Sequence, residues 1–216
     1  MDTNMLQLYA VTDSQWLKEG QTLAEAVEAA IKGGVTMVQL REKHLDDEAF
    51  IALAKDVKKV TDVYHIPFLI NDNINVCQAC DADGVHVGQE DMAAAKAREI
   101  LGKDKIIGVT AKTVEQAQEA VRQGADYLGS GAMFGSSTKS EAKPMTMEEF
   151  SKIRQAVDIP IVLIGGIDAA NIRELTGSGA QGAAIVSGIF AKEDIEGAAR
   201  ELKQLSLEVF PPEVKD

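Results

Sequence analysis

Three short apolar runs are each followed by side chains that could bind a phosphorylated ligand. In chain order these are Gln39, Leu40, Arg41, Glu42 and Lys43 after the run 35–38, Asn71 and Asp72 after the run 67–70, and Asp91 after the run 85–88. Arginine and lysine bind phosphate oxygens. Two carboxylates can hold a hard divalent ion that also contacts the phosphates. The pattern therefore predicts a site for magnesium and a diphosphate.

The apolar runs read as buried strands, and the carboxyl ends of parallel strands meet on one face, where ligands bind. Arg41 and Lys43 occupy alternate positions and therefore point to the same side. We interpret Arg41 as a clamp whose planar fork matches two phosphate oxygens, and Lys43 as a second positive charge. The alternative is a surface salt bridge with Glu42 or Asp47.

The carboxylates and the carboxamide have simpler alternative roles. Asp72 and Asp91 end neighbouring strand–helix units, and as a pair they predict a magnesium site, because such sites use one or two carboxylates together with substrate phosphates and waters. Each could instead cap a helix. Asn71 could donate to the substrate or close an Asx turn.

A second anion site is predicted farther along the chain. Gly165-Gly166 and Val186-Ser187-Gly188 each follow an apolar run, and in barrels these two loops often hold a phosphate on backbone N–H groups. The long connection 130–146 is a candidate lid, and its polar residues suit another anion: Ser136, Ser137, Thr138 and Lys139. Two phosphorylated substrates meeting on one rim indicate a transferase that displaces diphosphate.

Composition excludes several classes of protein. The chain has 216 residues, 45% hydrophobic content and a net charge of −12, without a basic stripe, which argues against nucleic acid as a partner. Its start carries no signal peptide, and no apolar stretch reaches membrane-spanning length. Cys77 and Cys80 have C-x-x-C spacing, but a second Cys/His pair for zinc is missing, so we interpret both as small buried residues. We expect a soluble cytoplasmic protein.

Strand and helix patterns alternate eight times. We expect strands at 6–11, 35–40, 67–70, 84–87, 105–109, 126–129, 160–164 and 183–186. We expect helices at 22–32, 46–60, 74–80, 92–101, 114–122, 147–156, 169–175 and 195–205, with Thr113 as a cap and Thr146 with Glu149 as a capping box. The pattern predicts a single (β/α)₈ TIM-barrel domain over 1–216, with the barrel at about 6–205 and an extension at 206–216. An open doubly wound sheet is the alternative.

These motifs together resemble the thiamine phosphate synthase family over residues 8–202. The resemblance rests on LYAVTD (8–13), QLREK (39–43), Asn71-Asp72, GVHVGQED (84–91), the loop 131–139, IGGI (164–167) and IVS (185–187). It implies a (β/α)₈ enzyme that joins hydroxymethylpyrimidine diphosphate to a thiazole ethyl phosphate. Magnesium would be the cofactor, and the two phosphorylated small molecules would be the substrates. We also expect the chain to form a homodimer.

The resemblance also implies residue roles. Residues 39–43 and Asn71 would bind the pyrimidine diphosphate, Asp72 and Asp91 would hold magnesium, and Thr110 stands where the family usually has serine near the pyrimidine. Ser136 and Thr138 would contact the thiazole phosphate, Lys139 the diphosphate, and Gly166, Val186 and Ser187 would complete the phosphate cup. The implied mechanism is dissociative: diphosphate leaves first, and the thiazole nitrogen captures the resulting cation. We expect Arg41, Lys43, Thr110 and Lys139 to act at the reacting groups.

Two other functions fit parts of the sequence. A related thiazole tautomerase typically lacks the magnesium carboxylates and has histidine after strand five, where this chain has Lys112. A non-catalytic barrel that binds phosphorylated metabolites would bind both ligands without releasing diphosphate. The loop 131–139 departs from the family pattern, which often has a proline after the glycine and a threonine at the position of Ser136. The loss of proline and the addition of Gly135 loosen the loop.

Overall fold

Eight parallel strands close into a barrel in sequential order in the computed structural model, which describes residues 1–89, 94–135 and 144–212. The strands are β1 (Leu8–Val11), β2 (Met37–Leu40), β3 (Phe68–Asn71), β4 (Gly84–Val87), β5 (Ile106–Thr110), β6 (Tyr127–Gly131), β7 (Ile161–Ile164) and β8 (Gly182–Ile185). β8 pairs with β1 to complete the ring. The predicted (β/α)₈ barrel is confirmed, and the open sheet is excluded.

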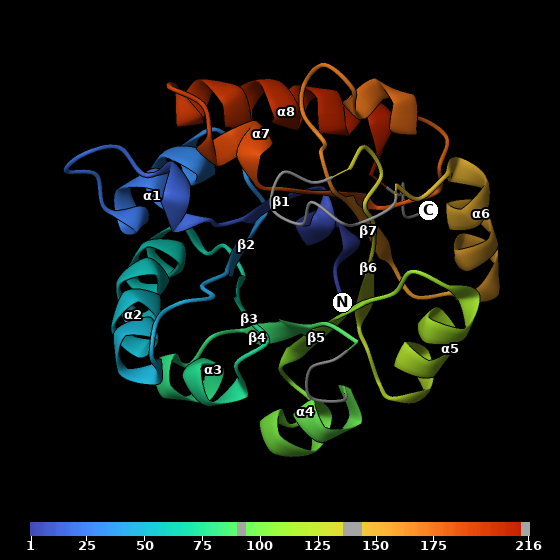
Figure 1. Cartoon of the computed structure of the whole chain (residues 1–216), viewed down its shortest axis with the longest axis horizontal. Coiled ribbons are helices and arrows are strands. Elements are labelled where there is room, and N and C mark those ends of the chain that lie inside the picture. The colour runs from blue at the N-terminus through green and yellow to red at the C-terminus, as the bar shows by residue number, and fades with distance from the viewer. Residues whose placement is uncertain (90–93, 136–143, 213–216) are drawn as a thin grey trace.

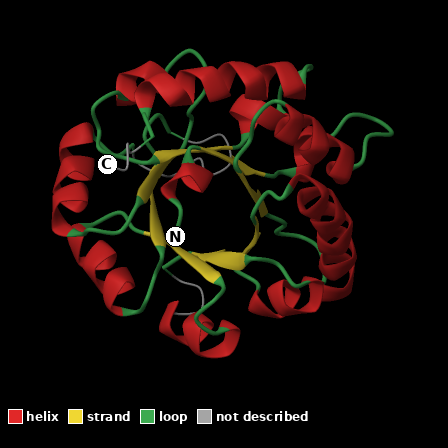
Figure 2. Cartoon of the chain, turned by 180° about the vertical axis from the view of Figure 1, so that it is seen from behind, coloured by secondary structure: helices red, strands yellow, loops and turns green. Residues whose placement is uncertain are grey.

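Helices surround the ring of strands (Figures 1 and 2). They are α1 (Leu23–Lys32), α2 (Asp47–Tyr64), α3 (Ile74–Cys80), α4 (Ala94–Leu101), α5 (Val114–Arg122), α6 (Met147–Ala156), α7 (Ser187–Phe190) and α8 (Ile195–Val209). Three 3₁₀ turns accompany them: η1 (Thr3–Leu6), η2 (Ser14–Trp16) and η3 (Ile172–Leu175). The predicted capping box of α6 and the Thr113 cap of α5 are both present.

The strands are buried on both faces, which explains their nearly continuous apolar sequences. Side chains on the outer face pack against the helices, and those on the inner face fill the barrel. The inner set includes Leu6, Tyr9, Met37, Leu69 and Tyr127. Alternation along a strand therefore decides which residues can reach the interior and its upper rim.

Several element boundaries differ from the sequence-based expectation. β1 begins at Leu8 rather than residue 6, because residues 3–6 form η1, which lies across the ring of strands in Figure 2. The expected helix 169–175 is only the turn η3. α7 was not predicted, and α8 continues to Val209, beyond the expected end at 205.

The end of α8 is held by the barrel floor rather than lying free. Val209 and Phe210 are buried. The Gln7 amide donates to the Phe210 carbonyl oxygen over 3.1 Å. Val209 and Phe210 are thus part of the packed body, although the sequence-based expectation placed them in the extension 206–216.

Both cysteines are buried free thiols, as expected. Burial raises the pKa of Cys77 to about 12, and burial also raises the pKa of Cys80. Both therefore stay protonated and poorly nucleophilic at neutral pH. Among the helices that the structure describes, none combines the length and apolarity needed to cross a membrane.

Glycine at position 108 makes room for a large aromatic ring inside the barrel. A Cβ atom on Gly108 would lie 2.2 Å from Cζ of Tyr127, which is fully buried. We predict that Gly108→Ala lowers the free energy of unfolding by about 2–3 kcal/mol, because the ring has no space to retreat. Urea denaturation followed by circular dichroism measures this change.

Gly102→Ala is the control for that measurement. Nothing lies within 4 Å of a Cβ at Gly102, but its φ of +80° imposes backbone strain, for which we expect about 1 kcal/mol. A Gly108→Ala cost no larger than the Gly102→Ala cost would contradict the packing described here.

Candidate active site

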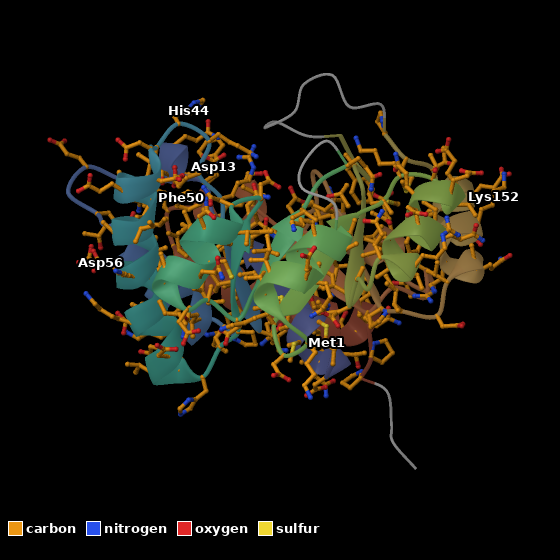
Figure 3. All side chains as sticks on the ribbon, turned by 90° about the horizontal axis from the view of Figure 1, so that it is seen from below. Met1, Asp13, His44, Phe50, Asp56 and Lys152 are labelled. Atoms are coloured by element: carbon orange, nitrogen blue, oxygen red, sulfur yellow. The ribbon has the colours of Figure 1, made fainter. Side chains whose placement is uncertain are left out.

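A cavity opens at the carboxyl ends of the strands, and all eight strands contribute to its lining or its rim. Nine of the residues predicted from sequence line it together: Gln39, Arg41, Lys43, Asn71, Asp72, Thr110, Gly166, Val186 and Ser187. In Figure 3 the labelled residues Asp13 and His44 mark one end of the barrel, and Met1 marks the opposite end. The predicted convergence of strand ends on one face is therefore observed.

Two predicted residues do not bring their side chains to the cavity. Leu40 is fully buried among the residues that pack between the sheet and the helices, because it alternates with Gln39 along β2. Glu42 accepts a hydrogen bond from the Ser14 hydroxyl. Five further predicted residues lie outside the described part of the chain: Asp91, Ser136, Ser137, Thr138 and Lys139.

Lys43 and Asp72 form an ion pair at the mouth of the cavity. The Lys43 Nζ lies 2.5 Å from the Asp72 Oδ2, and the Asn71 amide donates to the Asp72 Oδ1 over 2.9 Å. Asn71 also donates to the His86 carbonyl oxygen over 3.3 Å. Strands β2, β3 and β4 thus place one cation, one carboxylate and one carboxamide within mutual reach.

The backbone at Asp72 supports this arrangement. Asp72 is one of three non-glycine residues with positive φ in the described chain, at +61°, and aspartate tolerates this region better than most residues do. The cap of α3 is Asn73, whose side chain accepts from the Val76 N–H. The helix-cap alternative for Asp72 is therefore wrong, and so is the pairing of Lys43 with Glu42 or Asp47.

Arg41 directly follows β2 and lines the cavity. Its Nη1 lies 4.0 Å from the Asp13 Oδ2, and its backbone N–H donates to the Thr12 hydroxyl over 3.0 Å. The backbone hydrogen bond fixes the position of the Arg41 Cα. Because the guanidinium is 4.0 Å from Asp13, it remains able to bind another anion. Arg41 and Lys43 together form a cationic edge on an acidic protein.

The ends of β7 and β8 contribute close backbone approaches. Gly165 and Gly166 have φ of +101° and +66°, conformations that glycine adopts without a steric penalty. A Cβ on Gly166 would lie 2.8 Å from the Phe134 carbonyl oxygen. The predicted phosphate cup at Gly166, Val186 and Ser187 is therefore assembled as one surface, and its occupation by phosphate stays a prediction.

Three cavity residues with polar side chains were not predicted to contribute. Tyr9 and His86 lie in two of the motifs that carry the family resemblance but were given no role of their own, and Lys112 was noted only as a departure from the tautomerase pattern. His86 bonds to the Thr110 hydroxyl and to the Tyr127 hydroxyl. Their inward orientation depends on strand register, which sequence alone does not fix.

The fold and this cavity place the chain among the (β/α)₈-barrel enzymes. Residues 8–189 match the family model described as thiamine monophosphate synthase. The chain is 50% identical over 203 residues to a thiamine-phosphate synthase of Ruminiclostridium cellulolyticum, covering 94% of both chains. It is 49% identical over 194 residues to that of Clostridium acetobutylicum, covering 90% of this chain and 92% of the relative.

A solved structure agrees with the sequence relatives. Thiamine phosphate pyrophosphorylase from Pyrococcus furiosus superimposes with a TM-score of 0.87 at 37% identity, covering 96% of this chain and 98% of the other. The chain belongs to the thiamine monophosphate synthase family, and it is an enzyme of the transferase class that this family represents.

Removing the charge of Asp72 should alter anion binding far more than stability. We predict that Asp72→Asn lowers the free energy of unfolding by less than about 1 kcal/mol, because the pair with Lys43 is partly exposed. We also predict that the factor by which magnesium tightens binding of inorganic pyrophosphate falls about tenfold or more, as expected when one charged ligand is lost. Isothermal titration calorimetry with and without magnesium measures this factor.

Asp81→Asn is a matched control. Asp81 also has positive φ, at +52°, and pairs with Lys105 over 2.6 Å, but it does not line the cavity. Asparagine is tolerated in the same backbone region at both positions. Equal effects of the two substitutions on pyrophosphate binding would show that Asp72 has no special part in the site.

Proposed function

We propose that the chain condenses hydroxymethylpyrimidine diphosphate with (carboxy)thiazole ethyl phosphate to give thiamine monophosphate and diphosphate. The observation that supports this most is the joint placement of Arg41, Lys43, Asn71 and Asp72 on one cavity wall, opposite the glycine pair of β7. One wall carries the charges that a diphosphate needs, and the other offers the backbone that a monophosphate needs. Family membership supplies the identity of the two substrates.

The residues present fit the magnesium ion that the family implies. Asp72 offers a carboxylate at the cavity mouth, held by Asn71 and Lys43. Magnesium prefers hard oxygen ligands and usually takes one or two carboxylates, with waters and substrate phosphates completing the shell. Asp72 would therefore hold the ion together with Asp91. Magnesium, when bound, would supply positive charge that lowers the energy of the departing diphosphate.

The proposed reaction is dissociative. The bond between the pyrimidine methylene carbon and the diphosphate oxygen breaks first, the bonding electrons leave with diphosphate, and the thiazole nitrogen then attacks the cationic carbon. Arg41 and Lys43 would stabilise the charge that develops on the leaving group, and Lys139 would add to it. Gln39, Asn71 and Thr110 would hold the pyrimidine in place so that the two reactants meet in line.

The two alternative functions have less support. A histidine after β5, which the tautomerase pattern uses, is replaced by Lys112, whose side chain lines the cavity. Asp72 is present and reaches the cavity, whereas tautomerases of this type typically lack the carboxylate. A binding barrel without catalysis is distinguished by turnover. A homodimeric state and a cytoplasmic location stay predictions from the sequence.

The proposed activity requires both substrates and magnesium. We predict diphosphate release only when the pyrimidine diphosphate, the thiazole phosphate and magnesium are all present, because the thiazole nitrogen must capture the cation for net reaction. A coupled phosphate assay after pyrophosphatase treatment measures the release. The absence of product with all three present would remove the synthase assignment, and release without the thiazole would indicate hydrolysis instead.

Lys43 should be needed for turnover and not for folding. We predict that Lys43→Ala lowers kcat/KM about 100-fold or more, since one positioned charge on the leaving group is lost. The thermal midpoint should stay near that of the unaltered chain. Lys105→Ala is the matched control, because Lys105 makes a similar ion pair over 2.6 Å outside the cavity. Similar rates for the two variants would show that the cationic edge is misassigned.

A further inference from the structure

A continuous row of side-chain hydrogen bonds crosses the barrel interior along the lining of the cavity. The Gln39 amide donates to the Tyr9 hydroxyl over 2.6 Å, and the Tyr9 and Tyr127 hydroxyl oxygens lie 2.9 Å apart. The Tyr127 hydroxyl lies 2.9 Å from His86 Nδ1, and His86 Nε2 lies 3.0 Å from the Thr110 hydroxyl. The row joins residues of β2, β1, β6, β4 and β5.

Four members of this row line the cavity: Tyr9, Gln39, His86 and Thr110. Tyr127, at the centre of the row, is fully buried behind them. The barrel is shaped to hold the rings: Gly108 leaves space for Tyr127, and a Cβ on Gly129 would lie 3.1 Å from His86 Cε1. The row is therefore a built feature of the interior and not a chance contact.

The donors in the row can be ordered from its first member. An amide N–H can only donate, so the Tyr9 oxygen is an acceptor from Gln39. Among the described residues, the Tyr127 oxygen is the acceptor within hydrogen-bond distance of the Tyr9 hydroxyl. A buried proton left without a partner is costly, so Tyr9 donates to Tyr127. Tyr127 then donates to His86 Nδ1.

This order fixes the state of the last two groups. A histidine that accepts at Nδ1 carries its proton on Nε2 when neutral, so Nε2–H donates to the Thr110 oxygen. Because the Thr110 oxygen accepts from His86, the Thr110 hydroxyl proton can donate to a ligand in the cavity. At the other end of the row, the Gln39 amide N–H donates to Tyr9, and its carbonyl oxygen can accept from a ligand. Burial raises the pKa of both tyrosine hydroxyls, which keeps their protons in the row.

We propose that Tyr9, Tyr127 and His86 are positioning residues that fix the Thr110 hydroxyl as a donor and the Gln39 carbonyl as an acceptor toward one substrate. The ligand that this pair recognises is an aromatic heterocycle with a ring-nitrogen acceptor and an amino donor. An aminopyrimidine has both groups, so the inference rests on the proposed function, in which Gln39 and Thr110 hold the pyrimidine.

The direction of the row can be measured in the unaltered chain. Nitrogen-15 NMR of the unaltered chain with labelled histidine distinguishes a proton on Nε2 from one on Nδ1, and His86→Gln assigns the signal among the three histidines. The expected result is an His86 ring with Nε2 protonated and Nδ1 unprotonated. A proton on Nδ1 would reverse the row and overturn the proposal, whether or not the chain proves active as a synthase.

A double-mutant cycle tests whether Tyr127 acts through Thr110. We expect Tyr127→Phe to raise KM for the pyrimidine diphosphate about two- to tenfold, the loss expected for one neutral hydrogen bond. KM for the thiazole phosphate should change less than twofold. In the Thr110→Val background, Tyr127→Phe should have almost no further effect on the pyrimidine KM, because the group it orients is gone.

The controls separate positioning from stability. Tyr64→Phe removes a hydroxyl that donates to Glu28 over 2.7 Å on the outer helices and should leave both KM values unchanged. Thr110→Ser keeps the hydroxyl and should retain the response to Tyr127→Phe. Multiplicative effects of Tyr127→Phe and Thr110→Val would overturn the proposal while synthase turnover of the unaltered chain still upholds the proposed function.

Discussion

Closure of eight parallel strands is the constraint on which the cavity depends. Each strand end alone is a short polar segment, and residues such as Gln39, Asn71 and Thr110 are 30 or more positions apart. Parallel pairing in sequential order brings them to one rim. The chain as a whole carries a net charge of −12. An anionic ligand is therefore attracted only where positive charge is concentrated, as it is at Arg41 and Lys43.

The ion pair of Lys43 and Asp72 shows how the cavity balances its own charges. In the structure, the lysine is neutralised by the carboxylate over 2.5 Å. A divalent cation on the carboxylate would release the lysine toward a phosphate group. The pair is partly exposed, so it contributes little to folding. In the proposed function, it keeps two opposite charges close to where the metal and the diphosphate would each require one.

Much of this arrangement could be predicted from the sequence. Glycine-ended helices and apolar runs marked the eight units, and α3, α5 and α6 have the expected bounds. The carboxyl-end rule then placed Arg41, Lys43 and Asp72 on one face. Strands that are buried on both sides carry no alternation of polar and apolar residues, so their starts and ends were misjudged by one or two residues, as at β1 and β6.

The parts that could not be predicted depend on long-range geometry. Nothing near Tyr9 indicates that its hydroxyl meets Tyr127, 118 positions away, because that contact requires both strands to point the same side chain inward in matching register. The sequence predicts an extension beyond the barrel from residue 206, yet Phe210 is buried, and the Gln7 amide donates to its backbone carbonyl oxygen. Local sequence patterns predict individual helices and strands, whereas the hydrogen bonds inside the barrel depend on how its eight strands pair.

The most direct measurement is a crystal structure of the chain with magnesium and a non-hydrolysable analogue of the pyrimidine diphosphate. The diphosphate is expected between Arg41 and Lys43, with the metal on Asp72 and the pyrimidine ring between Gln39 and Thr110. A diphosphate bound away from Arg41 and Lys43, with Asp72 still paired to lysine, would contradict the central claim that this rim of the barrel recognises the leaving group.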